Sequence, residues 1–65
     1  MHGYDELLNG GHACVCVVVD DDGEWHWSAK RREYLTDPWT VIGIGEAPEL
    51  CEALRLARWV VGVER

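Results

Sequence analysis

A short acidic turn between two strand-like segments constrains the fold more than any other feature of this sequence. Positions 12–19 (HACVCVVV) are rich in β-branched side chains, and positions 24–30 alternate between polar and apolar side chains. Four turn residues stand between them: Asp20, Asp21, Asp22 and Gly23. Because an Asp-Gly pair tolerates the positive φ of tight hairpin loops, the sequence predicts a β-hairpin.

The second strand of this hairpin has one buried and one solvated face. Its buried face carries Trp25, Trp27 and Ala29. The length of the loop decides which side chains of the first strand join that face. A loop of two or four residues places there Cys14, Cys16 and Val18, and a loop of three residues places there Val15, Val17 and Val19. The sequence leaves both registers open.

One more strand and one helix follow. Positions 40–45 (TVIGIG) predict a short strand whose glycines allow a helix to approach closely. Pro48, early acidic residues and Gly62 mark a helix over positions 48–61. At 100° per residue its core stripe comprises Leu50, Ala53, Leu54, Ala57, Val60 and Val61.

At the start of the chain, Tyr4 to Leu8 followed by Asn9-Gly10-Gly11 predicts one or two helical turns with a stop signal. The predicted fold class is therefore α+β: a three-stranded antiparallel sheet packed on one C-terminal helix, with a short N-terminal helical segment, in the order αβββα. The other face of the sheet has little to cover it. Residues 1–65 form a single small domain, since a chain this short has no room for a second.

Charge and composition exclude several classes of function. Twelve acidic and six basic residues give a net charge of -6, which excludes a general binder of nucleic acid. No segment is long and apolar enough for a membrane span, and the N-terminus does not resemble a signal peptide. We therefore expect a protein of the bacterial cytoplasm that binds neither nucleic acid nor membrane directly.

The cysteines do not indicate a catalytic or metal site. Their number is odd, and Cys14 and Cys16 lie too far apart along a strand for good disulfide geometry, so we expect reduced thiols. The spacing of His12, Cys14 and Cys16 matches no strong zinc pattern, and a lone cysteine usually packs as a small apolar residue. We predict no metal, no cofactor and no catalytic residue, and hence no enzyme.

The acidic residues and one tryptophan are the candidate partner-binding residues. Asp20, Asp21, Asp22 and Glu24 crowd the hairpin tip, and Glu46, Glu49 and Glu52 lie along the start and outer side of the helix. Such clusters keep proteins soluble, but they also imitate nucleic-acid phosphates and attract a basic groove on a partner. Trp59 lies opposite the core stripe, so an interface, a covering segment or stacking by Arg55 must account for it. The predicted site comprises Asp20, Asp21, Asp22, Glu24, Glu49, Glu52 and Trp59.

Two segments resemble HicB-like antitoxins: DDDGEWHW, and GIGEAPELCEAL with the alanine-rich helix after it. The matching positions are Asp22, Gly23, Trp25 and Trp27, then Gly45, Ala47, Glu52, Ala53 and Leu54. The chain lacks the Pro-Gly-Cys type stretch and the DNA-binding extension of that family. The resemblance implies a βββα fold that binds a small toxin. The predicted element order also resembles double-stranded RNA-binding domains, but acids stand where that family carries lysines.

In profile, the chain also resembles the small phage or prophage inhibitors called anti-CRISPR proteins. The similarity rests on charge, on size and on the lack of an enzyme motif, and no residue carries it. It implies an acidic inhibitor that blocks DNA binding by a CRISPR-Cas complex as a nucleic-acid mimic. This is the function we expect, with a Cas subunit as the partner and a monomer or homodimer as the state of the chain. A HicB-like antitoxin module is the alternative.

Overall fold

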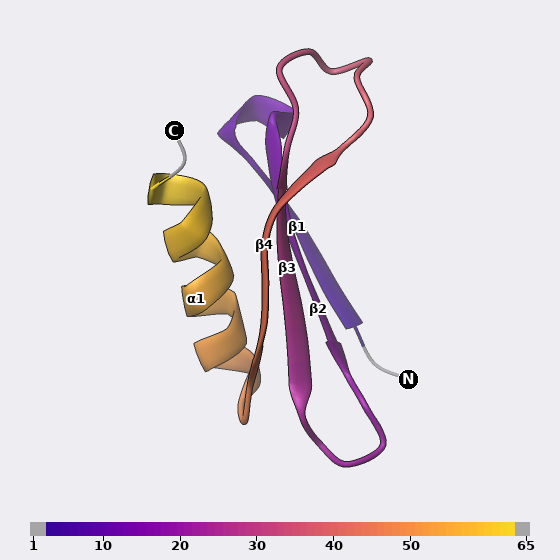
Figure 1. Cartoon of the computed structure of the whole chain (residues 1–65), viewed down its shortest axis with the longest axis vertical. Helices are drawn as coiled ribbons and strands as arrows, with labels where there is room; N and C mark the ends of the chain where they lie inside the picture. The colour runs from indigo at the N-terminus through magenta and orange to yellow at the C-terminus, as the bar shows by residue number, and fades with distance from the viewer. Residues whose placement is uncertain (1–2, 64–65) are drawn as a thin grey trace.

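A computed structural model describes residues 3–63 as one antiparallel sheet with a helix on one of its faces (Figure 1). The elements are β1 (Gly3–Leu8), a single 3₁₀ turn (Asn9–Gly11), β2 (Ala13–Val19), β3 (Trp25–Arg31), β4 (Thr40–Ala47) and α1 (Leu50–Val63). The strands lie side by side in chain order. The predicted α+β class, the antiparallel sheet and the C-terminal helix are therefore confirmed, but the sheet has four strands instead of three.

The additional strand is β1, so the predicted N-terminal helical segment is wrong. β1 pairs with β2 along its whole length, from Gly3 opposite Val18 to Leu8 opposite Ala13. Asn9 and Gly10 both have positive φ, 53° and 67°, as the tight turn of a hairpin requires. The Asn-Gly pair is thus a hairpin turn and not a helix stop. An isolated helix this short is unstable, whereas pairing with β2 satisfies the backbone of the segment.

The acidic turn between β2 and β3 has the three-residue loop. The backbone N of Asp20 donates to the carbonyl O of Glu24 over 3.0 Å, and Gly23 has a φ of 82°. Val19 therefore lies opposite Trp25 and Val17 opposite Trp27. Of the two registers that the sequence allows, the structure adopts the one that joins the odd-numbered valines to the tryptophans.

α1 covers this valine and tryptophan face, and the core lies between the two layers. Ala53 and Ala57 are fully buried and Val61 nearly so, while Leu50, Leu54 and Val60 pack around them. The predicted stripe is confirmed, although α1 lies two residues further along the chain than predicted. Pro48 consequently precedes the helix, and Gly62 lies within its last turn.

The small residues of the sheet decide how closely these layers approach. Val60 of α1 packs against Gly43, where an added Cβ would lie 2.9 Å from its Cγ1. At Gly45 the neighbour is Trp27, whose indole would lie 2.6 Å from an added Cβ. The expected close approach of a helix therefore occurs at Gly43, while Gly45 makes room for a tryptophan of the neighbouring strand. The Nε1 atom of Trp27 is buried there, and no hydrogen-bond partner for it is found among residues 3–63.

The opposite face of the sheet carries no helix (Figure 1). β1 extends the sheet at its edge and does not fold over this face. The longest dimension of the molecule is 36 Å. Within residues 3–63 there is no helix of the length and apolarity needed to cross a membrane.

Candidate binding site at the acidic end of the molecule

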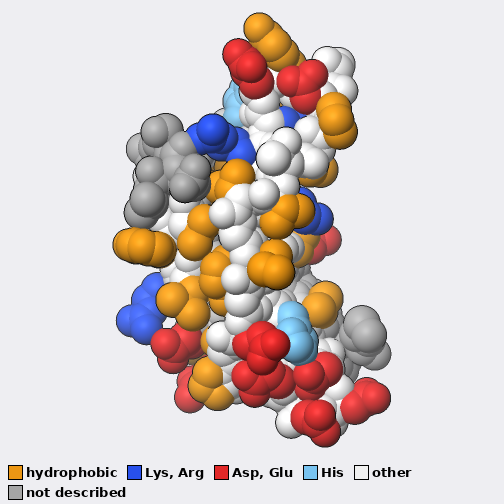
Figure 2. Space-filling model, viewed as in Figure 1, with side chains coloured by type: hydrophobic (Ala, Val, Ile, Leu, Met, Phe, Trp, Pro, Cys, Tyr) orange, Lys and Arg blue, Asp and Glu red, His pale blue; other side chains and the backbone are white. Residues whose placement is uncertain are grey.

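The strand register brings acidic residues from three separate segments to one end of the molecule. Trp25, the first residue of β3, lies opposite Ala47, the last residue of β4, so the hairpin tip, the end of β4 and the start of α1 are neighbours. Figure 2 shows acidic side chains gathered at this end. We call it the acidic end and define it by Asp20, Asp21, Asp22, Glu24, Glu46, Glu49 and Glu52.

Asp20 organises the hairpin tip. Its Oδ1 accepts hydrogen bonds from the backbone N of Asp22, at 2.9 Å, and of Glu24, at 3.0 Å. These bonds fix the loop, as aspartate does in many tight turns. Asp21 and Asp22 are exposed at the apex, and Glu24 is half-buried. One side chain of the cluster therefore holds the loop while its neighbours face solvent.

His26 lies between two of the acids. Its Nε2 is 2.7 Å from Oδ2 of Asp20, and its Nδ1 is 3.8 Å from Oε1 of Glu46. The hydrogen bond to Asp20 raises the pKa of His26 above its ordinary value, and the same bond lowers the pKa of Asp20. Both side chains are well exposed, so solvent screens the pair. At mildly acidic pH a protonated His26 thus offsets part of the negative charge here.

Two further glutamates stand at the start of α1. The carbonyl O of Glu49 accepts a hydrogen bond from the backbone N of Ala53 over 3.0 Å, so Glu49 directly precedes α1, which begins at Leu50. Glu52 lies in the first turn, where a carboxylate interacts favourably with the helix dipole. Its Oε1 also accepts a hydrogen bond from Nη2 of Arg55 over 3.1 Å. Arg55 is thus engaged with Glu52, one turn before Trp59.

Most of these charges lack a basic partner. Within residues 3–63, the only ion pair between the acidic end and an arginine or lysine is that of Glu52 with Arg55. Asp21, Asp22, Glu24 and Glu49 form no ion pair in that part of the chain. Carboxylates gathered at one end, without arginine or lysine beside most of them in the described residues, produce a negative potential that attracts a basic surface.

Trp59 lies away from the acidic end, on the outer side of α1. Its side chain is 66% exposed, and it borders a shallow hollow together with Arg55 and Leu56. It follows Glu52 by seven residues, which is about 10 Å along a helix and nearly the same side of it. The predicted position of Trp59 opposite the buried stripe is confirmed. A partner that binds the acidic end and also contacts Trp59 must therefore extend along α1 from its first turn.

The basic residues at positions 30–32 lie mainly in the sheet. Lys30 and Arg31 belong to β3, at the end far from the acidic residues. The guanidinium of Arg32 lies over the ring of Trp39 at 4.0 Å, and its Nε donates to the carbonyl O of Gly11 over 2.9 Å. These contacts hold the loop that follows β3 against the first hairpin turn.

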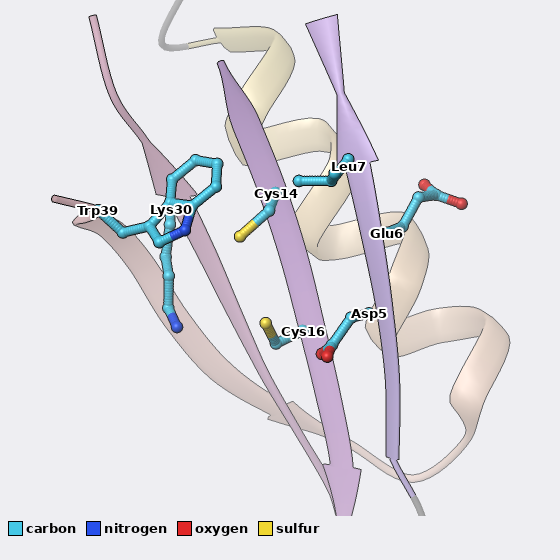
Figure 3. Close-up of a pocket in the computed structure, with 7 residues that line it drawn as sticks. All are labelled: Asp5, Glu6, Leu7, Cys14, Cys16, Lys30 and Trp39. Carbon is cyan, nitrogen blue, oxygen red and sulfur yellow. The ribbon is translucent and has the colours of Figure 1, made fainter. Parts of the chain in front are cut away.

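The uncovered sheet face contains a hollow of about 560 Å³. The hollow lies toward the end of the sheet opposite the acidic end. Figure 3 shows the residues that line it: Asp5, Glu6, Leu7, Cys14, Cys16, Lys30 and Trp39. Burial, and secondarily a hydrogen bond with Asp5, raises the pKa of Cys16 to about 11. Cys16 is therefore a protonated thiol at neutral pH and a weak nucleophile. In the described part of the chain, no three histidine, cysteine or acidic side chains are grouped as metal ligands would be.

Sequence reasoning selected the hairpin and helix acids but missed the contacts that tie this end together. The alternation of positions 24–30 predicts only that His26 lies on the solvated face of its strand, although its spacing from Asp20 across a tight turn is a signal for such contact. The pairing of His26 with Glu46 depends on the register of β3 and β4, which the sequence does not reveal. The ion pair of Glu6 with Arg58, at 2.6 Å, joins residues 52 positions apart and likewise has no sequence signal.

Comparison of the chain with protein-family models, with curated proteins and with solved structures gives no match.

Proposed function

We propose that this chain is a non-enzymatic acidic inhibitor whose acidic end occupies a basic, nucleic-acid-binding surface on a protein partner. The observation that carries the proposal is the meeting of seven carboxylates from three segments at one end, of which, within residues 3–63, only that of Glu52 pairs with an arginine. A groove that binds DNA is lined by lysine and arginine side chains that attract such a surface. In this proposal the carboxylates of the acidic end take the place of the phosphate groups of a bound nucleic acid.

The partner we propose is a subunit of a CRISPR-Cas complex in the cytoplasm of a bacterial host. The profile of a small acidic chain, which resembles anti-CRISPR proteins, supports this choice. Asp21 and Asp22 at the apex supply attraction, because they are exposed and form no ion pair in the described chain. Trp59 supplies an apolar contact further along α1, where an exposed aromatic side chain can be desolvated by a partner.

The test measures whether the chain displaces labelled target DNA from purified type I and type II CRISPR-Cas complexes in a mobility-shift assay. We expect inhibition that the double variant D21K/D22K abolishes. Raising the salt from 50 to 200 mM should weaken inhibition by at least about tenfold, since steered ion contacts are screened by salt. The matched control compares E33K with the single variant D21K, because both change the net charge by the same amount. Glu33 lies in the loop after β3, outside the acidic end.

The outcomes separate the proposed contacts. E33K should inhibit like the unchanged chain, whereas D21K should inhibit less. W59A should weaken inhibition without changing its salt dependence, because the side chain carries no charge. Failure to displace DNA from any complex, or inhibition equally insensitive to salt and to D21K/D22K, would refute the nucleic-acid mimic.

The alternative function is a HicB-like antitoxin module that binds a small toxin. The order of β2, β3, β4 and α1 is the βββα order that this resemblance implies, which supports keeping the alternative. It predicts a toxin gene next to the gene for this chain and a stable complex when the two are expressed together. Inhibition of DNA binding without such a neighbour would favour the mimic.

A further inference from the structure

The sheet face that α1 leaves uncovered has an ordered arrangement of side chains. Strand register places three rows of four residues on it: Leu7, Cys14, Lys30 and Val41; then Asp5, Cys16, Ser28 and Ile44; then Gly3, Val18, His26 and Glu46. We call these the first, middle and last rows. The last row lies at the acidic end.

This face carries exposed apolar side chains among its charged and polar ones. Eight large apolar side chains are exposed among the described residues, and four of them belong to these rows: Leu7 at 66%, Val18 at 42%, Val41 at 56% and Ile44 at 74%. Single exposed apolar residues are ordinary, but half of this set lies on one face of the sheet, where it offers apolar contact to a second surface.

Charge is distributed unequally along the strands. The first row carries Lys30, and no ion pair of Lys30 is found in residues 3–63. The last row carries Glu46 and His26, with Asp20 bonded to His26 beside it. The face is therefore positive at one end and negative at the other, so it is complementary to itself when turned end over end.

We propose that a second copy of this chain packs face to face on these rows, about a two-fold axis that runs across the strands between the two sheets. Such an axis sets the first row of each copy against the last row of the other. Lys30 then lies over His26 of the second copy, with the carboxylate of Glu46 on the neighbouring strand β4 as its acidic neighbour. Val18 of the second copy lies over Cys14, at the hollow lined by Leu7 and Trp39. The middle rows meet each other, with Ile44 against Ile44.

The other face-to-face axis, parallel to the strands, has no such complementarity. It would set first row against first row and bring the two Lys30 ammonium groups to the same end. It would also bring both acidic ends together. Like charges placed together across an interface oppose association, so charge selects the axis across the strands. By the same symmetry Asp5 of each copy lies opposite Asp5 of the other, on the exposed edge strand β1, where solvent screens the repulsion between the two carboxylates.

The size of the face fits a weak dimer. Four strands spaced at about 4.8 Å and six residues at about 3.4 Å each cover roughly 400 Å² per copy. Two such faces approach the lower limit of about 1,000 Å² for a specific interface. Association is therefore expected at micromolar or higher concentrations. The hairpin tips, with Asp21 and Asp22, project from opposite ends of this dimer and stay free for another partner.

Sedimentation equilibrium from about 1 to 500 µM tests the proposal, because the mass should rise from 7.4 kDa toward twice that value. I44K should weaken association by at least tenfold. The matched control is W59K, which adds the same charge to an equally exposed apolar position on α1, on the other side of the sheet. W59K should associate as the unchanged chain does. Circular dichroism verifies that both variants fold.

Charge exchange tests the axis itself. K30E and E46K should each weaken self-association, since each places like charges together. An equimolar mixture of K30E and E46K should associate again, because each variant then offers the charge that the other needs. A constant mass of 7.4 kDa up to 500 µM would overturn the proposal. So would dissociation by W59K but not by I44K, or a mixture that associates no better than its components.

Discussion

The two faces of one sheet differ sharply, although alternate residues of the same strands build them. The face under α1 holds fully buried Val15, Val17 and Ala29, with Trp27 packed over Gly45. The uncovered face exposes Val18 and Ile44 beside charged residues such as Lys30. Tight packing leaves no freedom to change the first face without loss of stability. Substitutions on the second face should cost the fold little stability, so its side chains are available for recognition.

The largest expected effect comes from filling the space under Trp27. G45V adds side-chain atoms where the indole would lie within 2.6 Å of the new Cβ, so Trp27 must be displaced. We expect a loss of about 3 kcal/mol in the free energy of unfolding, measured by urea denaturation. For a domain of this size that is a large share of the total stability.

The matched control for this change is another glycine. At Gly62 an added Cβ has no neighbour within 4 Å and the residue lies in α1, so G62A should stabilise the protein by up to about 1 kcal/mol. If G45V unfolds at the same urea concentration as the unchanged protein, the packing described under Trp27 is wrong.

A second prediction compares the faces directly by truncating one apolar side chain on each. V15A removes buried methyl groups and should cost about 2 kcal/mol, since the surrounding core relaxes only in part. I44A shortens a side chain that is 74% exposed and should change stability by about 0.5 kcal/mol or less in dilute solution. Equal losses would show that the uncovered face is covered at that concentration.

The smallest effect concerns the His26 contact in the last row of the uncovered face. Hydrogen bonding to Asp20 raises the pKa of folded His26 above its ordinary value of 6.5, so protonation favours the folded state. This stabilisation is complete below pH 6.5 and is lost as the pH rises through the raised pKa. The bond also lowers the pKa of Asp20, which preserves the contact in mild acid.

H26Q should therefore reduce the melting temperature more at pH 5.5 than at pH 8.5. Both side chains are exposed, so the difference should be smaller than the effect of V15A. H12Q is a matched control, because His12 is exposed in the first hairpin turn. A pH-independent difference between H26Q and the unchanged protein would contradict the ionic contact with Asp20.

Local sequence signals predicted most elements of the fold. Asp-Gly with alternating side chains gave the hairpin, and helical periodicity gave the buried stripe Ala53, Ala57 and Val61. The first eleven residues misled because their signals are ambiguous. Asn9-Gly10 ends a helix in one context and turns a hairpin in another, and only the availability of β2 as a partner decides between them.

The candidate site shows the same division. The residues that form the acidic end could be named from the sequence, since acidic runs at a turn and at a helix start are visible there. Their meeting at one end depends on β3 pairing with β4 from Trp25 opposite Ala47 onward. The contact of His26 with both Asp20 and Glu46 depends on the same register.

By itself, the sequence determined the class of fold, the stripe that α1 buries and the excess of negative charge, because these follow from side-chain chemistry and from periods of two and 3.6 residues. The tertiary structure alone decided that β1 is a strand, that the odd-numbered valines face α1 and that the acids of three segments lie together. These features require segments distant in the chain to pair in one register. The combined packing of the sheet and the helix sets that register. The sequence of a single segment therefore does not predict it.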